Sequence, residues 1–157
     1  RSLIGDAGLA CYLEAWHTCT MSKETDLAYI AGLFDGEGTV SLAVSSNRNA
    51  FRRVEVTLSS TDKCLCEFMV STLECGHVYP KQSRGKAHWK QAYEFRISGK
   101  MALTALRAMR PFLRCPKKMA RADIIISRFD LVTRRNGEYT QAEREAKAAF
   151  EADFFAA

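Results

Sequence analysis

The chain has 157 residues and a formal net charge of +5, which is long enough for one compact domain with a hydrophobic core. It has no apolar run that could span a bilayer and does not begin with a basic segment followed by an apolar one, so we expect neither a membrane span nor a secretory signal. Residues 48–128 hold 17 Lys and Arg against 6 Asp and Glu, whereas the rest of the chain holds 6 against 12. This basic middle favours a polyanion-binding surface, although a charged surface that only aids solubility would give the same pattern.

The six cysteines include no Cys-x-x-Cys pair, and the three histidines show no zinc-finger spacing. We therefore expect reduced thiols, no structural zinc and an intracellular, reducing location. The sequence does not distinguish an organelle from a bacterial or phage cytoplasm.

Residues 1–20 carry a patchy apolar pattern and are interpreted as a leader of uncertain status, ahead of a domain that we place at residues 21–136. Residues 27–38 predict an apolar helix, because Leu27, Ile30 and Phe34 recur at helical spacing and can dock into a core. A second stripe of small residues would let another helix approach closely: Ala28, Gly32 and Gly36. The helix ends in Asp-Gly-Glu-Gly, where we expect Gly36 and Gly38 to adopt positive φ in a turn around Glu37.

After this helix the apolar period changes to two, which predicts half-buried strands at residues 39–45 and 53–59. The inward positions are expected to be Val40, Leu42, Val44, Val54, Val56 and Leu58. The two polar faces form a ribbon that could enter the major groove of DNA, although an ordinary solvated sheet face has the same pattern.

A helix capped by Thr61 or Asp62 follows, and then strands begin near residues 78 and 88. Pro80 lacks an N–H group, so the third strand is expected at a sheet edge or at a bulge. Three more helices are predicted at residues 99–110, 117–134 and 141–154, and the last belongs to a C-terminal segment, residues 137–157, that packs on the domain or trails it. The expected fold class is α+β with the order αββαββαα.

Residues 30–38, Ile-Ala-Gly-Leu-Phe-Asp-Gly-Glu-Gly, resemble the motif of the LAGLIDADG homing endonucleases, and the resemblance in element order extends from about Thr25 to Phe129. One copy of the motif is present, so the chain resembles the single-motif members that act as homodimers. The resemblance implies a four-stranded antiparallel sheet, shaped as a saddle that sits on double-stranded DNA, with helices on one face. It also implies a dimer interface that includes Ala28, Ala31, Gly32 and Asp35.

The resemblance further implies a divalent-metal site at the end of the motif. Glu37 takes the position of the second acid, which holds the metal and is more often Asp in the family, and the carbonyl of Gly36 adds a ligand. Mg²⁺ or Mn²⁺ suits such a site, because waters and phosphate oxygens complete the shell of a hard cation held by few carboxylates. Asp35 is expected to make a structural hydrogen bond rather than to bind metal.

Two further catalytic positions depart from the family pattern. Ser60 stands where the family often has Gln, and the shorter side chain would act through water or not at all. Strict register places Pro116 at the lysine position, so we choose Lys117 as the catalytic lysine, with Lys118 as the alternative.

Polar residues of the predicted strands and turns are the candidates for DNA contact, because small polar groups bind bases through water and basic groups supply salt-dependent affinity. They are Thr39, Ser41, Ser45, Asn47, Arg53, Glu55, Thr57, Tyr79, Lys81, Lys90 and Arg96. We expect a homing endonuclease that cuts both strands of a long pseudo-palindromic site, with no membrane partner and no small-molecule substrate. An intron RNA maturase on the same scaffold and a catalytically silent DNA-binding regulator are the alternatives.

Overall fold

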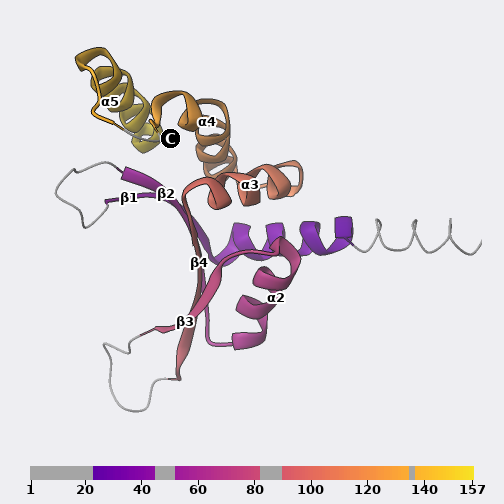
Figure 1. Ribbon diagram of the computed structural model, residues 1–157. Coiled ribbons are helices and arrows are strands. Elements are labelled where there is room, and N and C mark those ends of the chain that lie inside the picture. The colour runs from indigo at the N-terminus through magenta and orange to yellow at the C-terminus, as the bar shows by residue number, and fades with distance from the viewer. Residues whose placement is uncertain (1–22, 45–51, 82–89, 135–136) are drawn as a thin grey trace, which may run out of the picture.

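The computed structural model describes residues 23–44, 52–81, 90–134 and 137–157, and its α+β fold has the predicted order of elements (Figure 1). A helix over residues 23–37, here called the motif helix, comes first. It is followed by β1 (Gly38–Val44), β2 (Arg52–Ser60), α2 (Lys63–Leu73), β3 (His77–Lys81), β4 (Ala92–Ser98), α3 (Gly99–Met109), the short 3₁₀ helix η1 (Arg110–Phe112), α4 (Pro116–Val132) and α5 (Gln141–Ala156). The predicted leader, residues 1–20, lies outside the described residues.

The four strands form one antiparallel sheet in the order β1-β2-β4-β3. The predicted edge position of Pro80 is confirmed, because β3 has a strand neighbour on one side only. Figure 1 shows the motif helix, α2 and α3 on one side of the curved sheet, and no described helix covers the other side. The open face is therefore available to a large partner.

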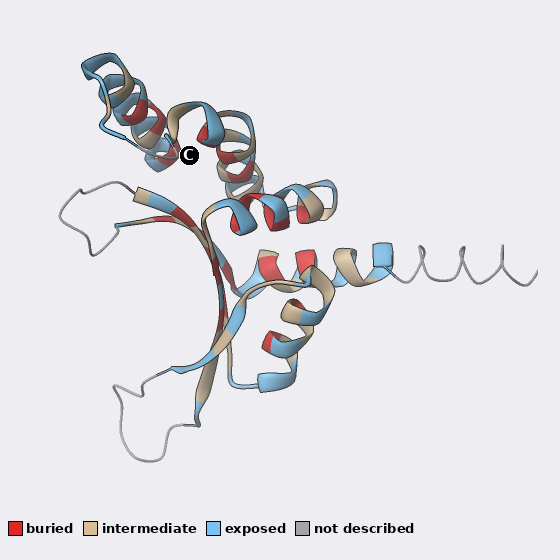
Figure 2. Ribbon diagram, in the orientation of Figure 1, coloured by how far each residue is buried: buried red, intermediate tan, exposed pale blue. Residues whose placement is uncertain are grey.

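The core lies between the sheet and these helices, as the buried residues in Figure 2 show. Its sheet side follows the alternation predicted for the first two strands, with Val40, Leu42, Val54, Val56 and Leu58 buried, and Phe95 and Ile97 of β4 are buried beside them. The inward position predicted for Val44 is wrong: this last residue of β1 is 58% exposed, because packing against the helices stops before the outer end of the strand. None of the described helices is both long and apolar enough to cross a bilayer.

The glycines at the end of the motif helix have a different role from the one expected. Neither Gly36 nor Gly38 adopts positive φ, since Gly36 continues the helix and Gly38 begins β1 without an intervening turn. A Cβ atom on Gly38 would lie 2.0 Å from Cδ2 of Phe34, whose ring fills that space. Glycine is needed at position 38 because a core aromatic packs against the backbone there, and not because the backbone turns.

The C-terminal helix α5 packs on α4, where Phe150 lies 6.3 Å from Phe129 between ring centroids. A second contact reaches the sheet: the guanidinium of Arg52 lies over the Phe155 ring, and its Nε is 3.1 Å from a carboxylate oxygen of Glu151. The last helix therefore closes one end of the core and also holds the first residue of β2.

Four cysteines fall within the described residues, and all four are free thiols: Cys64, Cys66, Cys75 and Cys115. Burial raises the pKa of Cys66 and Cys75. The raised pKa keeps both thiols protonated and unreactive near neutral pH. This agrees with the expectation of reduced thiols in the part of the chain that the structure describes.

We predict that Gly38→Ala destabilises the protein by about 1–3 kcal/mol, because the added methyl group would overpack the site that the Phe34 ring fills. Urea unfolding followed by circular dichroism measures this loss. In a Phe34→Leu background the same substitution should cost clearly less, since the ring that it meets has been removed. An equal cost in both backgrounds would contradict the packing explanation.

Candidate active site and nucleic-acid interface

The end of the motif helix is fixed to the segment that leads into α4. Oδ2 of Asp35 accepts hydrogen bonds from the backbone N–H groups of Arg114, at 2.6 Å, and Cys115, at 3.2 Å. The predicted structural hydrogen bond of Asp35 is therefore present, and it joins residues far apart in sequence. Two positions further on, Glu37 is exposed at the last residue of the helix. The first acid thus anchors the helix end and the second is left free to bind a ligand.

Lys118, rather than Lys117, lies against this helix end. Its ammonium group donates to the carbonyl oxygens of Phe34 and Asp35, each at 2.6 Å, and lies 5.5 Å from the centroid of the Phe34 ring. Carbonyl groups in the last turn of a helix have no partner within the helix, so a lysine here satisfies two of them and complements the helix dipole. Lys117 is exposed on the first turn of α4. Lys118 therefore has a structural contact with the motif helix, and the choice of Lys117 as the catalytic lysine stays a prediction.

The other predicted site residues lie at the same end of the sheet. Gly38 pairs with Leu58 across β1 and β2, so Glu37 and Ser60 emerge from the same ends of neighbouring strands. The hydroxyl of Ser60 accepts a hydrogen bond from the N–H group of Asp62 at 3.0 Å, which leaves its own proton available. The carbonyl group of Gly36, the predicted metal ligand, follows directly in the chain after the two carbonyl groups that accept from Lys118.

Among the described residues, no three His, Cys, Asp or Glu side chains gather in a way that could hold a metal ion. At the end of the motif helix, Glu37 offers an exposed carboxylate with the backbone carbonyl of Gly36 beside it. This donor set fits a cation such as Mg²⁺, which keeps several waters and binds through one or two carboxylates and substrate phosphates. It is incomplete for any metal that requires an all-protein cage.

The small-residue stripe of the motif helix is on the surface. Ala28, Gly32 and Gly36 are exposed, and a Cβ atom on either glycine would meet nothing within 4 Å. The expected interface position of Ala31 is corrected, because Ala31 is fully buried in the core of its own subunit. It lies four residues after Leu27 and three before Phe34, on the core-facing side of the helix.

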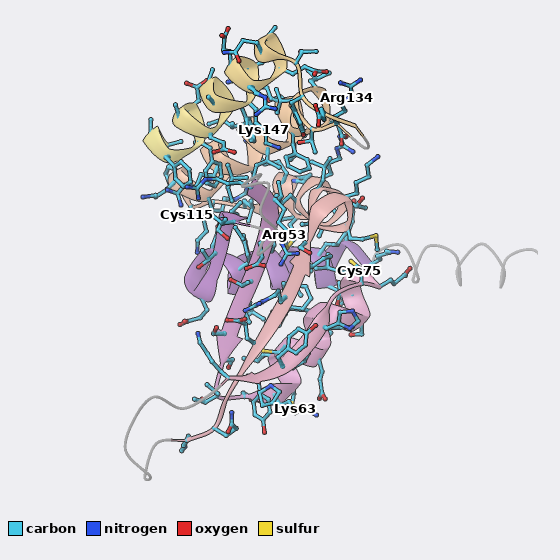
Figure 3. All side chains as sticks on the ribbon, turned by 60° about the vertical axis from the view of Figure 1, so that its left-hand side comes forward. Arg53, Lys63, Cys75, Cys115, Arg134 and Lys147 are labelled. Carbon is cyan, nitrogen blue, oxygen red and sulfur yellow. The ribbon has the colours of Figure 1, made fainter. Side chains whose placement is uncertain are left out.

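The open face of the sheet carries the residues predicted to contact DNA that the structure describes in strands. Cross-strand pairing puts Thr39, Thr57 and Arg96 in one row, and Ser41 and Glu55 in the next. The same face includes Arg53, Tyr79 and Lys81, and Figure 3 shows Arg53 on it. Lys90 is exposed two residues before β4, whereas Ser45 and Asn47 lie outside the described residues.

Two carboxylates, those of Glu55 and Glu94, lie among the basic groups of this face. Glu94, between Arg96 and Lys81, is hydrogen-bonded to Nε and Nη2 of Arg96, and its other oxygen is 3.7 Å from the ammonium of Lys81. The hydrogen bond with Glu94 raises the pKa of Arg96. Glu94 is not among the residues predicted to contact DNA, although the alternation of β4 puts it on the same face as Arg96.

A surface hollow of about 1140 Å³ lies at the β3 side of the sheet. Lys81, Glu94 and Arg96 line it, and so do the aromatic side chains of His77 and Tyr79. Charged hydrogen-bonding groups suit the edges of nucleic-acid bases, and flat rings suit their faces.

Comparison with known families identifies the scaffold. The model of the LAGLIDADG-like domain matches residues 24–109, which is more than half of the chain and includes the motif helix, the whole sheet and α3. The chain belongs to the LAGLIDADG family. No curated protein matches it.

Solved structures of homing endonucleases share the fold of this LAGLIDADG chain. I-CvuI, in complex with its target DNA, superposes with a TM-score of 0.57 at 19% identity, over 83% of this chain and 97% of I-CvuI. I-TnaI gives 0.58 at 18% identity, over 81% of this chain and 86% of I-TnaI. I-GzeII, in complex with a DNA target, gives 0.61 at 14% identity, over 80% of this chain but 43% of I-GzeII. At these identities the likeness establishes the homing-endonuclease fold alone.

The contacts of Lys118 lead to a prediction that separates it from Lys117. Lys118→Met should destabilise the LAGLIDADG subunit by about 1–3 kcal/mol, because two carbonyl groups at the helix end lose their partner. Lys117→Met, on an exposed position of the same helix turn, should change stability by no more than about 0.5 kcal/mol. Equilibrium urea unfolding of the two variants makes the comparison, and equal effects would refute the assignment.

Proposed function

We propose that this LAGLIDADG protein is a homodimeric, divalent-metal-dependent endonuclease that makes double-strand breaks in a long pseudo-palindromic DNA site. The observation that carries the proposal is the exposed Glu37 at the end of a helix that also exposes the small-residue stripe of Ala28, Gly32 and Gly36. Packing two such stripes across a two-fold axis would bring two glutamates together at the centre of a continuous saddle. Half-site symmetry in the DNA would follow from the symmetry of the protein.

The need for a second copy has two independent supports. The described residues of one subunit form no group of three or more His, Cys, Asp or Glu that could hold a metal, so a second glutamate and the DNA phosphates would add ligands to the single carboxylate of Glu37. The chain also covers nearly all of I-CvuI but less than half of I-GzeII. This is the length relation expected between one subunit of a dimer and a chain that contains both halves.

A bound Mg²⁺ or Mn²⁺ would polarise the scissile phosphate and lower the pKa of a bound water. Glu37 and the Gly36 carbonyl would hold the ion, while Asp35 and Lys118 fix the helix end that presents them. We propose that Lys117 and Ser60 act on water or phosphate near the site. Lys117 is exposed on the first turn of α4. The polar face of the sheet would position the duplex by phosphate contacts and recognise its bases.

Glu37→Gln should abolish cleavage and leave DNA affinity within a few fold, because it removes a metal ligand without removing a sheet contact. Duplexes bound from a randomised palindromic library are placed in a supercoiled plasmid, and linear product is measured with Mg²⁺ and with EDTA. The matched control is Glu24→Gln, an exposed glutamate in the first turn of the same helix. Normal cutting by Glu37→Gln would refute the catalytic assignment.

The same assay separates the alternative functions. Specific binding by the unmodified protein without any break in Mg²⁺ or Mn²⁺ would support a silent DNA-binding regulator. Absence of DNA binding together with faster splicing of the host intron RNA would support a maturase. Either result would contradict the proposed nuclease.

Gly32→Ala tests the dimer. A methyl group at this position meets nothing in the subunit and should raise helix stability by up to about 1 kcal/mol, but it would push two closely packed helices apart. Sedimentation equilibrium should therefore show weaker dimerisation of a subunit that is no less stable. Thr104→Ala, on the exposed face of α3, gives a comparable gain in helix propensity and should leave the dimer unchanged. A monomeric unmodified protein would refute the proposal.

A further inference from the structure

The strongest side-chain cluster on the open face of the sheet is centred on Glu94. The Glu94 side chain is 14% exposed, and both oxygens of its carboxylate have partners. Oε1 accepts hydrogen bonds from Arg96, and Oε2 faces the ammonium of Lys81. The ammonium of Lys81 also donates to the hydroxyl of Ser59 at 3.0 Å. These side chains come from three neighbouring strands, β2, β3 and β4, so the sheet itself fixes their positions.

The way in which Glu94 holds Arg96 determines which part of the guanidinium is free. Oε1 of Glu94 occupies the side of the group formed by Nε and Nη2. Among the described residues, none is hydrogen-bonded to the outer edge of the guanidinium, which is formed by Nη1 and the second hydrogen of Nη2. The Arg96 side chain is 46% exposed, so a ligand can reach this edge. Two parallel donors on that edge match O6 and N7 of guanine in the major groove.

The other arginine–carboxylate pair of this face, Arg53 with Glu55, differs in geometry. Its closest distance, from Nη2 of Arg53 to Oε2 of Glu55, is 3.8 Å. An ion pair at this separation, without a hydrogen bond between the two groups, does not fix the orientation of a guanidinium. Arg96 is therefore the arginine of the open face whose direction is set before any ligand binds, and preorganisation of this kind lowers the entropic cost of recognition.

We propose that Arg96, positioned by Glu94, is a specificity-determining residue that binds one guanine in the major groove of each DNA half-site. This inference rests on the proposed function, because it requires DNA on the open face of the sheet. Lys81, held beside Glu94, would contact the neighbouring base or phosphate. Glu94 does not itself bind a base. Its carboxylate occupies one side of the Arg96 guanidinium, so that side is not available to DNA. Its negative charge next to the guanidinium disfavours a simple phosphate contact.

The experiment selects bound duplexes from a randomised palindromic library in Mg²⁺-free buffer, with the full-length unmodified protein and with Arg96→Gln and Glu94→Gln. The unmodified protein should enrich a guanine at one position in each half-site. Arg96→Gln should lose that preference by about 5- to 150-fold, the range of one bidentate contact. Glu94→Gln should bind the library at least as tightly, because a negative charge is removed from the DNA-facing surface, but with a clearly weaker preference for the same guanine.

Asp130→Asn is the matched control, since it removes the carboxylate partner of an exposed arginine, Arg107, on the helices instead of on the sheet. It should leave both affinity and base preference unchanged. Circular dichroism of every variant establishes that each is folded, and both sheet substitutions are at positions outside the core.

If Glu94 only stabilised the sheet, Glu94→Gln would lower the affinity for all DNA sequences together. A variant that keeps or gains affinity but loses its preference for guanine would therefore support a positioning role. Base preferences that remain unchanged in both Arg96→Gln and Glu94→Gln would overturn the inference while leaving the nuclease proposal intact. Failure of the unmodified protein to bind any duplex would overturn both.

Discussion

The end of the motif helix is the constraint on which the rest of the structure depends. Within four residues the chain must pass from a fully buried Phe34 to an exposed Glu37 and then enter the first strand. Hydrogen bonds to Asp35 and from Lys118 hold this short segment from the side of α4, and the lack of a side chain at Gly38 makes room for the phenyl ring. A helix end without these partners would fray, and the direction of the glutamate would be lost.

This anchoring explains why a single carboxylate could be enough for a site. The chain uses the first acid of its motif for its own structure and leaves the second exposed, so in the proposed dimer each copy would contribute one glutamate to the site. The same helix carries an exposed stripe without side-chain bulk, which is the requirement for close approach of two backbones. In the proposed dimer the smooth helix face would bring the two helices together, and the anchored helix end would fix where each glutamate lies.

Much of this arrangement could be predicted from the sequence, because it rests on local periodicity. The change from helical to alternating spacing after Glu37 predicted β1 and β2, and Pro80 indicated that β3 lies at an edge. Three-dimensional packing decided the rest. The role of Gly38 depends on a ring four residues away, and the contact of Lys118 with the helix end depends on how α4 packs against the motif helix. Ala31 was misplaced because a small residue is equally consistent with a core and with an interface.

Glu94 illustrates a different limit. Its position on the open face follows from the alternation of β4, yet a carboxylate on a surface expected to bind DNA is easily overlooked among the basic residues. In the structure it organises two of the basic groups of that face. Acids placed between cations lower the affinity of a surface for phosphates of any sequence, while correctly oriented donors remain for bases. Since a site-specific protein is judged by the ratio of specific to non-specific binding, a face that gives up some general attraction gains discrimination.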